Sequence, residues 1–218
     1  MSPSTATAAR QTARRAAGER RRAVVRRRRR AALAILAVAV VVAAVVLGLP
    51  VARKAVNELG LPLHYQDVIR QQAAEKHLDP ALIAAVIYAE TKFDARTSSA
   101  GAEGLMQILP GTARFLAHRS GATTFSTRDL ATPQVNIAYG SYYLRYLLNE
   151  YHGSMVLALA AYNGGEANVS HWIAAHGGRA QDFKIDEIPF PETRAYVERV
   201  LSAQRDYRRA YASQLGYD

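Results

Sequence analysis

The fold is decided by the stretch DPALIAAVIYAETKFDARTSSAGAEGLMQ, residues 79–107. Asp79 followed by Pro80 is typical of a helix start, because the carboxylate caps free backbone N–H groups and proline has no N–H to leave unpaired. Apolar side chains then recur at helical spacing up to Glu90. We therefore predict a helix over residues 80–90, followed by a polar, serine-rich loop over residues 91–102.

Glu90 falls on the apolar stripe of this predicted helix. It stands seven positions after Ile83, four after Val86 and three after Ile87, and no Lys or Arg lies three or four positions away. Burial and the helix dipole both favour the protonated carboxyl there, which is the form that a general acid needs. The alternative is a glutamate at a frayed helix end that turns into solvent, and spacing alone leaves both interpretations open.

The chain beyond residue 63 predicts further helices and no convincing strand. Thr132 before Pro133 repeats the helix-start pattern, and Ser154 is a third predicted cap. The predicted helices cover approximately residues 64–77, 110 onward, 133–151, 155–162, 166–175 and 191 onward. The predicted fold class is therefore all-α, in one domain over residues 64–218.

The net charge of +10 comes entirely from the first thirty residues. Residues 1–30 hold eleven Arg and one acid, Glu19, whereas the remaining residues hold 17 Lys and Arg against 17 Asp and Glu. A nucleic-acid-binding domain usually carries its excess of positive charge on the folded body. The neutral body therefore argues against nucleic acid as a partner, and the Arg-rich residues 1–30 are expected to be a disordered tail.

An apolar run follows this tail. Residues 31–49 contain no charged or hydrogen-bonding side chain and, as a helix, would span roughly 28 Å, close to the thickness of a bilayer core. We predict a single transmembrane helix over residues 31–50, with the Arg-rich tail cytoplasmic and the domain outside the cytoplasm after a linker over 51–63. A cleaved signal peptide is the alternative, although the run is longer than an ordinary signal core.

Three blocks of sequence carry a family resemblance. The first is ETKFD (90–94) with SSAGAEGLMQ (98–107), the second is AAYNGG (160–165) and the third is IPFPETRAYV (188–197). Together they resemble the motifs of lytic transglycosylases of the soluble-lytic type, over roughly residues 64–205. Gly164 departs from the alanine that usually follows the asparagine of the second block.

This resemblance implies a lysozyme-like helical domain that cleaves peptidoglycan glycan strands with one catalytic glutamate, Glu90. In the family this acid protonates the bond between N-acetylmuramic acid and N-acetylglucosamine, and the muramic 6-hydroxyl closes a 1,6-anhydro ring in place of water. The 2-acetamido group takes the part of the second carboxylate that most glycosidases need. The resemblance also implies substrate-binding residues: Ser98 or Ser99, Met106, Gln107, Tyr162, Asn163 and Glu192.

Each supporting residue also has a structural explanation that the sequence alone leaves open. The serines suit turns, Met106 and Tyr162 suit packing, and Glu192 suits the start of a helix in any protein. The chain has no cysteine and no histidine pair with metal spacing, so we expect no metal or organic cofactor. The rival functions are a lysozyme-type hydrolase on the same fold and a non-catalytic scaffold that binds the cell wall.

Overall fold

The computed structural model describes residues 60–217, which belong to one compact unit, Asn57–Asp218. Within the described residues, no helix is both long and apolar enough to cross a bilayer. The tail predicted over 1–30 and the span predicted over 31–50 lie outside the described residues, as does the linker before residue 60.

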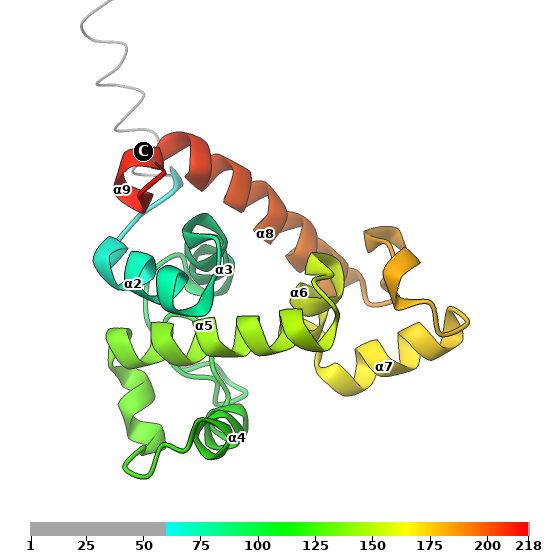
Figure 1. Ribbon diagram of the computed structural model, residues 1–218, viewed down its shortest axis with the longest axis horizontal. Coiled ribbons are helices and arrows are strands. Elements are labelled where there is room, and N and C mark those ends of the chain that lie inside the picture. The colour runs from blue at the N-terminus through cyan, green and yellow to red at the C-terminus, as the bar shows by residue number, and fades with distance from the viewer. Residues whose placement is uncertain (1–59, 218) are drawn as a thin grey trace, which may run out of the picture. The chain divides into compact units, whose positions relative to one another are not determined.

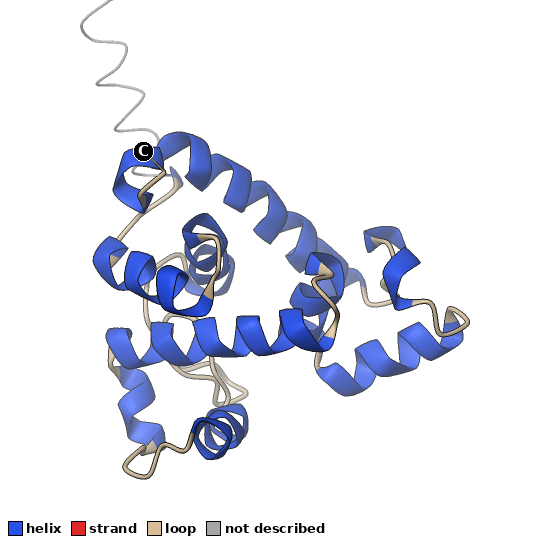
Figure 2. Ribbon diagram, viewed as in Figure 1, coloured by secondary structure: helices blue, strands red, loops and turns tan. Residues whose placement is uncertain are grey.

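The described residues form α-helices joined by loops and short 3-10 turns, without a strand (Figure 2). The only strand-like feature among them is an isolated bridge between Glu103 and Ile108. This confirms the prediction of a mainly helical domain. The α-helices are α2 (Gln66–Lys76), α3 (Pro80–Thr91), α4 (Pro110–Ser120), α5 (Pro133–Glu150), α6 (Met155–Gly164), α7 (Glu166–Ala175), α8 (Pro191–Ala210) and α9 (Ala212–Leu215).

Helix α3 lies between α2 and α8 and packs against both (Figure 1). It packs most extensively against α8, and every residue from Ala81 to Ile87 is buried. Burial of apolar side chains on all sides over about two turns makes α3 the main hydrophobic element of the core. Glu90 lies at the C-terminal end of α3, so the packing of this helix fixes the position of its backbone.

The predicted caps are confirmed at two helices and not at a third. The Asp79 carboxylate accepts from the Ala81 N–H at 3.0 Å, and the Ser154 hydroxyl accepts from the Leu157 N–H at 3.4 Å. Thr132 occupies the N-cap position of α5, but its side chain makes no capping bond. Pro133 at the first helical position explains that helix start without the threonine hydroxyl.

The sequence did not predict α9 or the short 3-10 helices η1 (Thr127–Ala131), η2 (Ala180–Asp182) and η3 (Ile185–Glu187). These are one-turn elements, too short for an apolar period to show. The connection between α4 and α5 contains the longest of the 3-10 helices, η1, at whose start Ser126 and Asp129 form a reciprocal capping box.

Two sets of hydrogen bonds fasten the beginning of the described chain to its end. The Tyr207 hydroxyl donates to the Pro62 carbonyl at 2.6 Å, and the Tyr211 hydroxyl donates to the Leu61 carbonyl at 2.7 Å. At the start of α3, Asp79 accepts from Gln204 of α8 at 2.6 Å and from the hydroxyl of Tyr217. Helices α3 and α8 are therefore held in register by polar contacts as well as by their apolar faces.

Candidate active site

Glu90 lies in the last turn of α3 and is mostly buried. Burial raises the pKa of its carboxyl from the ordinary 4.5 to about 7, against the smaller lowering effects of Tyr196, Arg199 and Arg96. The predicted direction is confirmed: removal from water disfavours the charged form more than the surrounding groups favour it. A carboxyl with a pKa near 7 can both give and take a proton near neutral pH.

Two arginines from outside the helical spacing of α3 influence Glu90. Arg96, six residues along, donates from its guanidinium to the Glu90 backbone carbonyl at 3.0 Å, and Arg199 comes from α8. Sequence spacing along one helix could not show either contact, because both arginines belong to other segments. No ion pair joins either arginine to the Glu90 carboxylate among residues 60–217, so the acid is influenced without being neutralised.

Tyr196 is a further residue of the site that sequence reasoning missed. Its side chain, on α8, is 2% exposed, and its hydroxyl has no partner at ordinary hydrogen-bond geometry among the described residues. It lies close enough to Glu90 to lower the pKa of the carboxyl, and the Glu90 charge in turn raises the pKa of the tyrosine, after burial itself. The third sequence block contains Tyr196 and was the signal that could have found it.

The loop after Glu90 is tied to α3 by Thr91. The Thr91 hydroxyl is buried and donates to the Leu105 carbonyl at 2.8 Å. Ser98 closes the turn within the loop, where its hydroxyl accepts from the Ala102 N–H at 3.0 Å. Ser99, the other candidate, is exposed. The loop therefore folds back over the end of α3 and brings the two halves of the first sequence block together.

Gln107 occupies a strained position in this loop. Its φ is +50°, in the left-handed region that non-glycine residues seldom adopt. Its side-chain amide nitrogen donates to the carbonyls of Arg96 at 2.7 Å and Gly104 at 2.8 Å, so it holds the loop from inside. Lys92 and Phe93, just after Glu90, also have positive φ. Such outliers often occur at functional sites, where the surrounding structure holds them in place.

Met106 is fully buried. Its side chain packs so closely against Gly140 of α5 that a Cβ built on the glycine would lie 2.3 Å from the Met106 sulfur. Its backbone N–H donates to the buried Asn136 side chain at 2.8 Å, and the Asn136 amide also reaches the carbonyls of Glu103 and Leu130. Met106 and Asn136 thus anchor the loop to α5, and Asn136 is a positioning residue that the sequence did not reveal.

Tyr162 brings the second sequence block to the first. It lies near the end of α6, and its hydroxyl donates to the Met106 carbonyl at 2.8 Å. The Glu90 charge contributes to the raised pKa of Tyr162, behind the dominant effect of burial, so the two side chains interact. All three blocks therefore meet around Glu90, through Met106, Tyr162 and Tyr196.

Two further candidate residues, besides Ser99, lie on the surface. Asn163 follows Tyr162 near the end of α6, and Glu192 lies in the first turn of α8; both are exposed.

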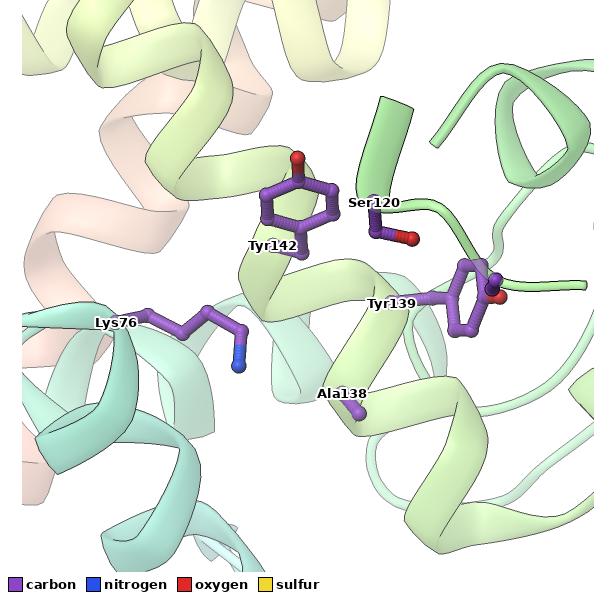
Figure 3. A pocket seen from close by; sticks show the side chains of 6 residues that line it. Lys76, Ser120, Ala138, Tyr139 and Tyr142 are labelled. Carbon is purple, nitrogen blue, oxygen red and sulfur yellow. The ribbon is translucent and has the colours of Figure 1, made fainter. Parts of the chain in front are cut away.

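Within the described part of the chain, no group of His, Asp and Glu is arranged to hold a metal ion. A separate pocket of about 410 Å³ lies over α5, lined by Lys76, Ser120, Ala122, Ala138, Tyr139 and Tyr142 (Figure 3), and none of the candidate residues lines it.

The sequence profile described as "Transglycosylase SLT domain" matches residues 67–184. The chain is 33% identical over 150 residues to the soluble lytic murein transglycosylase of Escherichia coli K12, covering 67% of this chain and 23% of that protein. It is 29% identical over 169 residues to the membrane-bound lytic murein transglycosylase C of Edwardsiella ictaluri.

Solved structures show the same likeness. An inactive mutant of the lytic transglycosylase Slt from Pseudomonas aeruginosa superposes with a TM-score of 0.64 at 32% identity, over 72% of this chain and 26% of that one. The chain belongs to the SLT transglycosylase family, which confirms the resemblance found in the sequence. It spans about a quarter of the length of the E. coli and P. aeruginosa proteins.

Proposed function

We propose that this protein is a peptidoglycan lytic transglycosylase in which Glu90 is the single acid and base. The observation that carries the proposal is the Glu90 carboxyl, whose burial raises its pKa to about 7 at the point where all three family blocks meet. Membership of the SLT family and the likeness to lytic transglycosylases support the same activity. The substrate is the β-1,4 bond between N-acetylmuramic acid and N-acetylglucosamine.

In the proposed mechanism, the protonated Glu90 donates its proton to the glycosidic oxygen as the bond to the muramic C1 breaks. The 2-acetamido oxygen of the muramic acid stabilises C1 on the opposite face, so no second carboxylate is needed. The Glu90 carboxylate then takes the proton of the 6-hydroxyl, and O6 bonds to C1 as the acetamido oxygen leaves. The proton taken from the 6-hydroxyl replaces the one given to the glycosidic oxygen, so Glu90 returns to its acid form and no water is consumed.

The surrounding residues are proposed to keep Glu90 ready for both steps. Tyr196 and Arg199 lower its pKa, which helps the carboxylate form after the first proton transfer, while burial favours the acid form needed for that transfer. Ser98 or Ser99, Met106, Gln107, Tyr162, Asn163 and Glu192 are proposed to bind or position the glycan.

The test is digestion of purified murein by the full chain, followed by mass spectrometry of the products. We expect 1,6-anhydro ends, one water lighter than hydrolysed ends, and loss of these products with Glu90→Gln. Glu198→Gln, at an exposed position of α8, is the matched control and should retain activity. Products with reducing ends would favour a lysozyme-type hydrolase instead, and unchanged activity of Glu90→Gln would remove Glu90 from the mechanism.

We also propose that residues 31–50 anchor the protein in the cell membrane, with residues 1–30 cytoplasmic and the folded domain outside. The apolar length of this segment and the arginines before it support the proposal. A chain lacking residues 1–50 should leave the membrane fraction on alkaline extraction, whereas the full chain should remain. Release of the full chain would contradict the anchor, and a shortened mature protein in cells would indicate a cleaved signal.

A further inference from the structure

Arg96, in the loop after α3, returns to the end of that helix. Helix α3 has no basic residue in its last turn, and among residues 60–217 no backbone N–H donates to the Glu90 carbonyl. The Arg96 guanidinium donates to that carbonyl at 3.0 Å and so supplies the missing partner. A cation at this end of a helix is also attracted by the partial negative charge of the free carbonyls. Arg96 therefore caps the turn that carries the proposed acid.

The backbone of Arg96 is held by the second half of the first sequence block. Its carbonyl accepts from the Gly104 N–H at 3.1 Å and from the Gln107 side-chain amide at 2.7 Å. Two consecutive hydrogen bonds thus lead from Gln107, a proposed glycan-binding residue, through Arg96 to Glu90. A shift of the loop at Gln107 would therefore move the residue that caps α3.

Arg96 differs from the other groups that face Glu90 in the segment that supplies it. Arg199 and Tyr196 belong to α8 and Tyr162 belongs to α6, so the packing of helices fixes their backbones. Arg96 belongs to the loop, and its side chain is exposed. Burial raises the pKa of the Glu90 carboxyl, and the charge of Arg96 is among the effects that lower it. The position of the loop therefore affects both the placement and the charge of the acid.

We propose that Arg96 is a positioning residue, which couples the glycan-binding part of the loop to the Glu90 carboxyl. This inference rests on the proposed transglycosylase function, because it takes Glu90 to be the acid and Gln107 to lie against the glycan. A strand bound at Gln107 holds Arg96 against the end of α3, and Glu90 is then aimed at the glycosidic oxygen. Arg96 itself touches neither the sugar nor the transferred proton, so its loss slows the reaction without weakening the binding of the strand.

The experiment measures kcat, KM and the pH dependence of kcat/KM for the full chain in detergent on glycan strands of fixed length. Arg96→Met removes the charge and the hydrogen bond. We expect kcat to fall about tenfold with KM unchanged, because a misplaced acid slows the reaction without loosening the substrate. The alkaline fall of kcat/KM should move to higher pH, since a charge that lowers the Glu90 pKa is gone. Arg96→Lys keeps a charged donor and should restore the pH dependence and most of kcat. Arg205→Met, at an exposed position of α8, is the matched control.

Gln107→Met tests the coupling, because it keeps the length of the side chain and donates no hydrogen bond to the Arg96 carbonyl. In a double-mutant cycle on kcat, the variant with both substitutions should lose no more than the larger of the two single losses, since both changes break the same series of contacts. Losses that multiply would mean that the two residues act independently, and would overturn the coupling. An unchanged kcat and pH dependence in Arg96→Met would overturn the positioning role itself.

A second arm needs no turnover and so separates this inference from the proposed function. Urea unfolding followed through Trp172, the single tryptophan, compares the protein with its Glu90→Gln variant at a series of pH values. The difference in unfolding free energy grows with pH and levels off near the pKa that Glu90 has in the folded state. We expect this pH to be higher when both proteins also carry Arg96→Met. The same pH with and without Arg96→Met would overturn the role of Arg96 even if the protein cleaves murein.

Discussion

Replacing Glu90, the proposed catalytic acid, should stabilise the protein, and more at alkaline than at acidic pH. The folded state holds the Glu90 pKa at about 7 against an ordinary value of 4.5. Because the folded state prefers the protonated form, stability is greatest below pH 4.5 and is lost as pH rises through 7. At about 1.4 kcal/mol per pKa unit, ionisation of Glu90 costs about 3 kcal/mol at pH 8 and under about 1 kcal/mol at pH 5.

Glu90→Gln keeps the shape of the side chain and cannot ionise, so it should remove this cost. The protein has a single tryptophan, Trp172, which is 8% exposed and packs against Phe190 at 5.0 Å. Its fluorescence therefore reports unfolding of the described domain alone in urea titrations of the full chain. We expect the gain in unfolding free energy from Glu90→Gln to be about 2 kcal/mol larger at pH 8 than at pH 5. Glu198→Gln, which also removes one carboxylate, controls for the change in net charge. An equal gain at both pH values, or a larger gain at pH 5, would refute the reasoning.

Three further substitutions have expected outcomes. Tyr196→Phe removes a hydroxyl that lowers the Glu90 pKa, so the alkaline fall of kcat/KM should move up by about half a pH unit; a downward move would contradict its role. Gly140→Ala should destabilise the domain by about 2 kcal/mol, since the added methyl overlaps Met106, whereas Gly111→Ala, with open space around it, should not; Trp172 fluorescence in urea measures both, and equal effects would count against the overlap. Asn136→Ala removes the partner of the Met106 N–H and of the Leu130 carbonyl, and one of the two donors to the Glu103 carbonyl, and should cost about 3 kcal/mol in the same titration; a cost below about 1 kcal/mol would mean that water or a shifted loop replaces those bonds.

The main helices could be predicted because their start signals are local. Asp79 and Pro80 lie within one turn of the helix they open, as do Pro110 and Pro133, and each helix begins where the sequence indicates. The period of a single helix placed Glu90 on the apolar stripe but left open whether its side chain turned into solvent. The family blocks favoured the buried, catalytic interpretation.

The remainder of the site depends on contacts between distant segments, which no local pattern contains. Arg199 and Tyr196 reach Glu90 because α8 packs along α3, more than a hundred residues earlier in the chain. Asn136 looks like an ordinary polar residue on α5, and only its bonds to Met106 and Glu103 of the loop, with a third to Leu130 of η1, reveal that it positions Met106. The resemblance implied that Gln107 binds substrate, but no sequence pattern indicated that its amide nitrogen donates to two carbonyls of the loop.

The hydroxyls of Tyr207 and Tyr211, bound to the carbonyls of Pro62 and Leu61, hold the start of the described chain against the C-terminal end of α8. The N-terminal half of the same helix carries Tyr196, which lies beside Glu90. One helix therefore links the point where the chain enters the described domain to the surroundings of the proposed acid.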